Sequence, residues 1–397
     1  MHQMNLFDGV VASYMDGAPR TNEQLYRDLI ETGCVSEGDL AKKVPVGQAG
    51  VMFSLVKRRV RWYQQELRRL NVIERVPEKR GSWRLADRDK KDLTKAPPGV
   101  VMLGFSSDLG VALWGSCQDV FGSLTENIAV CLTSPPYPLR KPRAYGNPAE
   151  TEWVDWMCRA LEPIVKRLLP GGSIALVLSN DLFEKGQPSR SLYRERFTIE
   201  MSRRFSMSLM DTVIWANNSK APGPCQWASL QRMQLNTGYE PVLIFCNDPL
   251  KSFADNRRVL EPHTETHRRL IASGGEHRAR VNSDGAYRVK VGAYGTPTAG
   301  RIPKNVLHMG HSCADQLRMR KLARSAGLPV HGATFPLALA MFLVRYLSRP
   351  GDLVVDPFGG TMTTAKACEM LGRLWLSCEL MAEYVMAGRF RFEGHAD

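Results

Sequence analysis

Residues 352–380 read DLVVDPFGGTMTTAKACEMLGRLWLSCEL, and this stretch decides the fold. A short apolar run ends at Asp356, a glycine-rich turn and a helical segment follow, and a second apolar run ends at Glu379. Glycines let a backbone approach a ligand closely, and an acidic residue about 20 positions later commonly binds a ribose diol. We therefore expect a nucleoside cofactor at this turn.

The glycine pattern argues against two classes of nucleotide-binding protein. The turn reads DPFGG instead of G-x-G-x-x-G, and the chain contains no G-x-x-x-x-G-K-[ST], so neither an NAD enzyme nor a P-loop ATPase is indicated. Thr361, Thr363 and Thr364 stand at the predicted helix start, where hydroxyl groups and backbone N–H groups bind carboxylates well. The turn therefore favours a cofactor with a carboxylate tail.

From residue 110 onward the sequence is typical of an α/β protein. Near-continuous apolar strands that alternate with helices imply a sheet covered on both faces, which is a doubly wound architecture. Ligands of such sheets bind at the carboxyl ends of the strands. The expected strands are IAVCLT (128–133), SIALVLS (173–179), DTVIWA (211–216), PVLIFC (241–246), DLVVD (352–356) and RLWLSCE (373–379).

A second strand end carries chemistry, because IAVCLT leads directly into Ser134-Pro135-Pro136-Tyr137. Proline fixes φ, lacks an N–H donor and restricts the residue before it, so this segment forms a rigid bend with free carbonyl oxygens. Such a bend suits a planar substrate that bears an amine. Ser134 and the Pro135 carbonyl would accept the two amine hydrogens, and Tyr137 would stack on a base rotated out of its helix.

S-P-P-Y after a strand, combined with D-P-F-G-G, resembles the amino-methylating DNA methyltransferases that use S-adenosylmethionine. In that family D-P-P-Y is typical of adenine-N6 enzymes. S-P-P-Y followed by a basic run and Y-G-N (145–147) is similar to the cytosine-N4 enzymes. The catalytic motif precedes the cofactor motif, as in the family's permuted order. The resemblance thus implies a circularly permuted, Rossmann-like methyltransferase sheet and methyl transfer to N4 of a flipped cytosine.

The resemblance also implies which residues form the site. HGATFP (331–336) is similar to the segment that contacts the methionine part of the cofactor, and Ser116 stands where the family often has an acidic contact near the adenine. Met362 replaces the final glycine of the turn. The expected catalytic residues are Ser134, Pro135, Pro136 and Tyr137, and the expected cofactor-binding residues are Ser116, Phe335, Pro336, Asp356, Pro357, Phe358, Gly359, Gly360, Thr361, Thr363, Thr364 and Glu379.

Composition points to a nucleic-acid partner. The chain has 53 Lys and Arg against 40 Asp and Glu, and a formal charge of +13 favours a polyanion. No segment approaches the ~18 apolar residues of a membrane span, and the N-terminal residues do not read as a signal peptide. Nine cysteines without C-x-x-C and histidines without a full ligand set indicate reduced cytosolic thiols and no metal site. We expect a cytoplasmic protein that acts at the nucleoid on double-stranded DNA, as a monomer or homodimer, with a cognate restriction endonuclease as a candidate partner.

The expected organisation has a winged-helix-like accessory domain (1–90), a linker (91–107) and a methyltransferase domain (108–397) with a target-recognition insert (250–304). The small domain is expected to contain capped helices at Thr21 and Ser36, a helix over 49–70 and a hairpin. A role in domain packing or self-association remains open for it. The expected DNA-binding residues are Lys57, Arg58, Arg59, Arg140, Lys141, Arg143, Arg257, Arg258, Arg268 and Arg269.

Other functions remain as alternatives. Adenine-N6 methylation is the nearest, because the same acceptors fit either amine. A non-catalytic DNA-binding regulator is more remote. Pro224-Cys225 resembles the nucleophile motif of cytosine-C5 enzymes, but here the cofactor turn follows the cysteine instead of preceding it. RNA is less favoured as a substrate, because nothing in the chain resembles an RNA-binding module.

Overall fold

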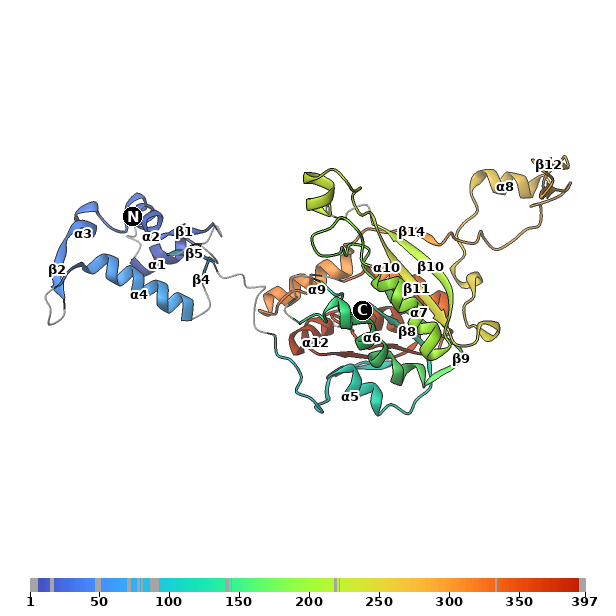
Figure 1. Cartoon of the computed structure of the whole chain (residues 1–397), viewed down its shortest axis with the longest axis horizontal. Coiled ribbons are helices and arrows are strands. Elements are labelled where there is room, and N and C mark those ends of the chain that lie inside the picture. The colour runs from blue at the N-terminus through green and yellow to red at the C-terminus, as the bar shows by residue number, and fades with distance from the viewer. Residues whose placement is uncertain are drawn as a thin grey trace. The chain divides into compact units, whose positions relative to one another are not determined.

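The computed structural model describes residues 6–14, 18–46, 51–69, 73–76, 79, 81–85, 93–139, 143, 145–217, 220, 222–332 and 334–392. The contacts divide the chain into two compact units, Met1–Asp92 and Leu93–Asp397 (Figure 1). Among the described residues, no helix has both the length and the apolar character that crossing a bilayer requires.

Where the structure describes it, the first unit consists of four helices, a three-stranded sheet and a two-stranded sheet. The capping box predicted at Thr21 and the cap predicted at Ser36 are confirmed, and the predicted hairpin forms between β4 and β5. Its core includes Tyr14, Leu25, Leu29, Val60 and Trp83. The winged-helix interpretation of this unit stays a prediction. The elements are α1 (Leu6–Ala12), β1 (Arg20–Thr21), α2 (Asn22–Glu31), α3 (Glu37–Ala41), β2 (Lys43–Val46), β3 (Val51–Ser54), α4 (Leu55–Arg69), β4 (Ile73–Arg75) and β5 (Ser82–Leu85).

The helix expected over 49–70 is shorter than the sequence predicted. Residues Val51–Ser54 form β3, which pairs antiparallel with β2, and α4 begins only at Leu55. The Ser54 hydroxyl accepts a hydrogen bond from the Lys57 backbone N–H at 3.4 Å, as an N-terminal cap does. Helical spacing continued across this boundary in the sequence, so periodicity alone placed the helix start too early.

In the second unit, the described residues form one mixed sheet of nine strands in the order β14-β10-β11-β9-β8-β15-β16-β7-β6. Strands β9, β8, β15, β16 and β7 run parallel, whereas β11 and β6 run antiparallel to their neighbours. The predicted doubly wound α/β sheet is therefore confirmed. The strands are β6 (Met102–Ser106), β7 (Gly110–Trp114), β8 (Ile128–Thr133), β9 (Leu168–Val177), β10 (Ser208–Ala216), β11 (Tyr239–Cys246), β14 (Val306–His308), β15 (Leu353–Asp356) and β16 (Leu374–Glu379).

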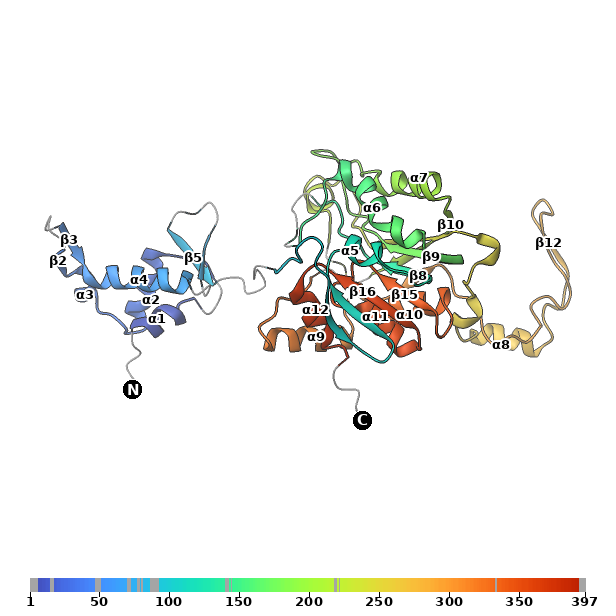
Figure 2. The same cartoon turned by 90° about the horizontal axis from the view of Figure 1, so that it is seen from below.

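Helices cover both faces of this sheet, with α6 and α7 on one side and α10 and α11 on the other (Figure 2). Alternate side chains of β8 supply the two cores, since Val130 and Leu132 pack with α10 whereas Cys131 packs with α6. This alternation explains the continuous apolar runs. The helices are α5 (Cys117–Gly122), α6 (Glu150–Val165), α7 (Tyr193–Phe205), α8 (Glu265–Ala272), α9 (Ala314–Ser325), α10 (Leu337–Leu347), α11 (Thr363–Leu371) and α12 (Ala382–Arg389).

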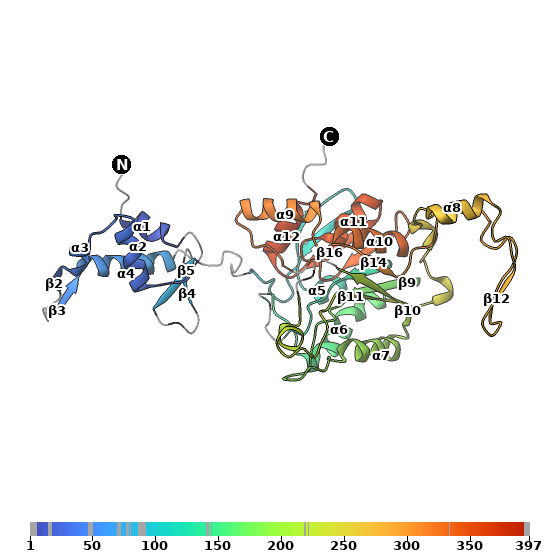
Figure 3. The ribbon, with the colours of Figure 1, turned by 90° about the horizontal axis from the view of Figure 1, so that it is seen from above.

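The expected linker is partly incorrect. Residues 102–106 form β6, an edge strand of the large sheet that pairs with β7, so the second unit already begins at Leu93. The segment between β11 and β14 carries α8 and the hairpin of β12 (Arg280–Asn282) and β13 (Tyr287–Val289), which lie outside the large sheet (Figure 3). The edge strands β6 and β14 are short and mostly exposed, unlike the buried central strands.

The sheet has its switch point between β8 and β15. After β8 the chain crosses through α6 to β9, and after β15 it crosses through α11 to β16 on the other side. The two loops therefore diverge and leave a crevice at the carboxyl ends of these strands. Residues 134–137 and 357–362 follow these two strands, so the two predicted motifs meet there although more than 200 residues separate them.

Arg258 is a structural residue, which contradicts its expected role in DNA binding. Its Nη1 atom lies 2.9–3.2 Å from three backbone oxygens at the start of the insert and the end of α10, those of Phe253, Tyr346 and Ser348. The neighbouring Arg257 pairs instead with Asp255 and is 83% exposed. Of these two arginines, Arg257 is the one that an external partner can reach.

Replacing Arg258 by alanine should lower the free energy of unfolding by about 2 kcal/mol, because carbonyl oxygens lose a charged donor. Urea denaturation followed by circular dichroism measures this loss. Arg257→Ala is the matched control and should leave stability unchanged, because its ion pair is solvent-exposed. An equal loss in both variants would show that Arg258 does not fasten the insert to α10.

Candidate functional site

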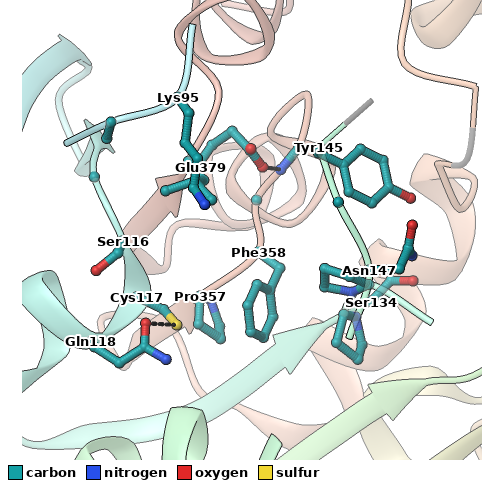
Figure 4. A pocket seen from close by; sticks show the side chains of 18 of the residues that line it. Lys95, Ser116, Cys117, Gln118, Ser134, Tyr145, Asn147, Pro357, Phe358 and Glu379 are labelled. Atoms are coloured by element: carbon teal, nitrogen blue, oxygen red, sulfur yellow. Dashed lines mark hydrogen bonds between the residues drawn. The ribbon is translucent and has the colours of Figure 1, made fainter. Parts of the chain in front are cut away.

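A cavity of about 850 Å³ opens at the switch point between β8 and β15. Phe358 projects between Glu379 and Ser134, which belong to the two predicted motifs (Figure 4). Asp356, Thr364 and Pro336 are not among the lining residues. The expected site residues that do line the cavity are Ser116, Ser134, Pro135, Pro136, Tyr137, Phe335, Pro357, Phe358, Gly359, Gly360, Thr361, Thr363 and Glu379.

Asp356 acts behind the wall of the cavity and does not reach into it. Its Oδ1 accepts hydrogen bonds from the Thr133 hydroxyl at 2.6 Å and from the Phe358 N–H at 3.1 Å, and its Oδ2 accepts one from the Thr364 hydroxyl at 2.7 Å. Burial raises the pKa of this carboxyl to about 6, although these hydrogen bonds favour the ionised form. The direct cofactor contacts expected of Asp356 and Thr364 are therefore replaced by a structural role.

The glycines of the turn are required by close packing. A Cβ on Gly359 would lie 2.1 Å from the Ser377 Oγ, and Gly360 has a φ of +50°. Met362 takes the left-handed conformation at φ +61°, where the family pattern has glycine. Its side chain fits because Gly388 of α12 leaves room, since a Cβ there would lie 2.5 Å from the Met362 Cγ. The turn therefore forms despite the methionine.

Glu379 is a buried carboxylate in the wall of the cavity. It ends β16, and its two oxygens accept hydrogen bonds from the Gly360 and Met381 N–H groups, both at 2.9 Å. It is 8% exposed, and burial, together with the charge of Asp356, raises its pKa to about 7. A carboxylate can accept further hydrogen bonds, so this group can bind ligand hydroxyls.

Side chains restrain the bend after β8. The Trp153 indole donates to the Pro136 carbonyl at 2.7 Å, and the Asn147 amide donates to the Tyr137 carbonyl at 2.6 Å. The Pro135 carbonyl accepts a hydrogen bond from no residue that the structure describes. Among the described residues it therefore has no donor, whereas the other two carbonyls of the bend, which the sequence also left free, are occupied.

Sequence reasoning missed an aromatic group that lines the same cavity. Tyr145 stacks on His331 with ring centroids 5.6 Å apart, and His331 meets the Tyr384 ring edge-on at 4.5 Å. Burial and the nearby charge of Arg143 lower the pKa of His331 to about 4, so the ring stays neutral at neutral pH. Tyr145 belongs to the Y-G-N segment and His331 to the HGATFP segment. Nothing in the sequence indicated that these two rings stack on each other.

Ser116 was expected to contact the adenine of the cofactor, but its hydroxyl forms hydrogen bonds at the start of α5 instead. Its hydroxyl caps α5, accepting from the Asp119 N–H at 3.1 Å and donating to the Asp119 carboxylate at 2.7 Å. Gln118 of the same turn lines the cavity (Figure 4). Residues 95–98, expected within the linker, also line it, because Lys95 pairs with Met381 beyond β16. That pairing has no signal in the sequence.

The remaining basic residues are spread over several elements. Arg140 and Lys141 fall outside the described residues. Arg143 is exposed, and its N–H donates to the Asn147 side chain at 2.6 Å. The other expected contacts lie on two helices: Arg268 and Arg269 on α8, both paired with Glu265, and Lys57, Arg58 and Arg59 on α4, where the ammonium group of Lys57 lies 4.9 Å from the centre of the Tyr26 ring.

Cys225 is not positioned to attack a base. It is exposed at the start of the η2 segment (Cys225–Leu230), and it is not among the residues that line the cavity. In the described part of the chain, no three His, Cys, Asp or Glu side chains lie together so that they could hold a metal ion. The cavity lining offers oxygen acceptors, aromatic rings and the glycine-rich turn.

The sequence profile of the family described as DNA methylase matches residues 128–389. The Type II methyltransferase M.PvuII of Proteus hauseri is 31% identical to this chain over 268 residues, which are 67% of this chain and 78% of M.PvuII. The chain belongs to the DNA methylase family. The expected family is thereby confirmed.

Two further relatives of this DNA methylase are informative. A solved structure described as PvuII DNA methyltransferase (cytosine-N4-specific) has a TM-score of 0.58 and 29% identity, and the match covers 74% of this chain and 90% of that chain. The DNA adenine methyltransferase YhdJ of Escherichia coli is 35% identical over 63 residues, which are 16% of this chain and 21% of YhdJ. The similarity to the PvuII methyltransferase extends over most of the second unit.

The cavity of this DNA methylase fits S-adenosylmethionine, the methyl donor of the family. Glu379 offers a buried acceptor for ribose hydroxyls, and a Cβ at Gly359 would collide with the next strand, so the turn admits only glycine there. The lining of the cavity includes aromatic and proline side chains, which suit a purine ring. The residues present therefore match a nucleoside cofactor.

Cofactor affinity of the DNA methylase should depend on pH through Glu379. Ribose hydroxyls favour the ionised carboxylate, so binding releases a proton and affinity rises with pH. With a pKa of about 7, the dissociation constant should be about tenfold larger at pH 6 than at pH 8. Calorimetric titration with S-adenosylmethionine measures this slope. Glu379→Gln should bind S-adenosylmethionine more weakly, and its dissociation constant should not depend on pH in this range. An unchanged pH dependence in that variant would show that another group releases the proton.

Proposed function

We propose that this DNA methylase transfers a methyl group to the exocyclic N4 of a flipped cytosine in double-stranded DNA. The observation that carries the proposal is the pair of oxygen acceptors after β8, Ser134 Oγ and the free Pro135 carbonyl, in the same cavity as the turn and Glu379. An exocyclic amine has two hydrogens to donate, and two acceptors on a rigid bend can hold both. The PvuII relative, whose name specifies cytosine N4, agrees with this substrate.

Binding of the extruded base is energetically reasonable. Unstacking a base costs a few kcal/mol, and stacking on an aromatic side chain returns roughly 1–3 kcal/mol. Tyr137 and Tyr145 both line the cavity and offer such rings. The acceptors then fix the orientation of the amine, because Trp153 and Asn147 already engage the two carbonyls that follow.

Catalysis in this proposal rests on alignment. S-adenosylmethionine supplies an activated methyl group when it is bound. Hydrogen bonds from the amine to Ser134 and Pro135 draw its lone pair out of conjugation with the ring and stabilise the positive charge that develops on nitrogen. No covalent enzyme intermediate is needed, which agrees with the position of Cys225 outside the cavity.

Several groups extend the proposal to DNA binding. Arg257 and the α8 arginines Arg268 and Arg269 belong to the insert, which we propose recognises the target sequence, and Lys57, Arg58 and Arg59 belong to the first unit. Such cations contact phosphates and make affinity depend on salt. A cognate restriction endonuclease is the proposed partner, because M.PvuII is a Type II methyltransferase. This substrate would place the protein with the chromosome in the cytoplasm.

Mass spectrometry of nucleosides from DNA treated with the protein and labelled S-adenosylmethionine tests the proposal. Labelled N4-methylcytosine is the expected product. N6-methyladenine would instead favour the adenine alternative, for which the short match to YhdJ provides some support. A product labelled at C5, or no labelled base at all, would overturn the proposal.

Ser134→Ala should lower the rate of methyl transfer by roughly 10²-fold, because one of two acceptors for the developing charge is lost. Single-turnover kinetics with radiolabelled cofactor measures the effect. Cys225→Ser is the control and should retain most of the activity, since its thiol is exposed and outside the cavity. The reverse pattern, an inactive serine variant at 225 and an active alanine variant at 134, would indicate C5 chemistry.

A further inference from the structure

The hydroxyl of Tyr137 takes part in a short chain of hydrogen bonds at the cavity. Its oxygen lies 2.8 Å from the Ser134 Oγ and 3.2 Å from the backbone oxygen of Val177 at the end of β9. A carbonyl oxygen only accepts, and a phenol has a single proton to give. The arrangement in which both contacts are hydrogen bonds has Tyr137 donating to Val177 and the Ser134 hydroxyl donating to Tyr137.

This direction determines what Ser134 can offer to a substrate. Its only proton is engaged by the phenol, so the lone pairs of its oxygen are left for the cavity. The Pro135 carbonyl beside it accepts from no described residue and has no proton to give. The Ser134 oxygen and the Pro135 carbonyl are therefore both acceptors.

We propose that the Tyr137 hydroxyl is a positioning group that makes Ser134 an obligate acceptor, so that the site selects a base carrying an amine over one carrying a carbonyl at the same position. The inference rests on the proposed function and deepens it, because it names the feature of the base that is selected. Cytosine and uracil differ at this position by NH₂ against C=O. A carbonyl there would face two acceptors and lose its hydrogen bonds with water without replacing them.

The same chain excludes Ser134 as a general base. A proton passed from Ser134 to Tyr137 would have to continue to the Val177 carbonyl, which does not hold one. Burial raises the pKa of the Tyr137 phenol, so it does not become a phenolate that could take the proton. The proton that the methylated amine sheds goes to water, and Ser134 serves only as an oriented acceptor.

Tyr137→Phe isolates the hydroxyl, because it keeps the ring that packs against the α6 side of the sheet. Tyr193 provides a matched control. It is a buried tyrosine at the start of α7, and its hydroxyl donates to the backbone oxygen of Ser179 at 2.6 Å. Tyr193→Phe therefore leaves one buried carbonyl without its donor, as Tyr137→Phe does, but does not change the Ser134 proton.

The test uses the full chain and duplexes that carry cytosine or uracil in the mapped recognition site. Each target base is placed opposite an abasic site, so that neither base has a partner to lose. Fluorescence anisotropy with S-adenosylhomocysteine present measures the dissociation constants. The wild type should prefer cytosine roughly tenfold or more, and Tyr137→Phe should reduce this preference to about threefold or less, because a freed serine proton can be donated to the carbonyl.

Activity provides a second measurement. The single-turnover rate of Tyr137→Phe on cytosine should fall roughly three- to tenfold, while its affinity for S-adenosylmethionine stays unchanged. Tyr193→Phe should keep both the rate and the base preference of the wild type. A preference that survives in Tyr137→Phe, or a wild type that binds uracil as well as cytosine, would overturn the inference.

Failure of the proposed function is recognised separately. If nucleoside analysis yields N6-methyladenine, cytosine methylation is wrong, but the amine selection can still be measured with adenine and hypoxanthine as the target bases. If no base is methylated, the binding comparison between cytosine and uracil still reports whether the hydroxyl of Tyr137 sets the preference.

Discussion

The site depends on one buried carboxylate, Asp356, at the end of β15. It binds the Thr133 hydroxyl at the end of β8 and the Thr364 hydroxyl in the first turn of α11. It thereby joins the strand that carries the catalytic bend to the turn that carries the cofactor residues. These bonds add a side-chain connection to the backbone pairing of β8 with β15, at the point where the two loops diverge. Isolated buried charges are costly, and here the donors around Asp356 offset that cost.

Most polar groups of the bend after β8 form hydrogen bonds with other residues of the protein. These bonds fix the orientation of the acceptors that remain. The Pro136 and Tyr137 carbonyls are engaged by Trp153 and Asn147, and the Ser134 hydroxyl is engaged by the Tyr137 phenol. The oxygen atoms left over are those that a substrate can use. Preorganised acceptors of this kind need not reorganise during the reaction, which is why they contribute strongly to catalysis.

Departures from the family pattern at the turn are compensated by neighbouring residues. Met362 adopts a left-handed conformation that usually belongs to glycine, and it is tolerated because its side chain is fully buried against Gly388. Ser116 replaces an acidic contact, but its hydroxyl serves as a helix cap. Gln118 and the segment from Lys95 supply polar atoms on that side of the cavity instead. A motif can thus change while the cavity that it forms persists.

The sequence by itself determined the α/β class, the central strands, both motifs and part of the cavity lining, because buried strands, proline bends and glycine turns have local signatures. It did not determine that Asp356 faces inward, that Arg258 fastens the insert to α10, or that Tyr145 stacks on His331. It also placed β6 in a linker and extended the helix of α4 over β3. These features arise from contacts between residues distant in the chain. Only the tertiary structure decides which partner satisfies each polar group, since local sequence sets what a side chain can donate or accept but not what it meets.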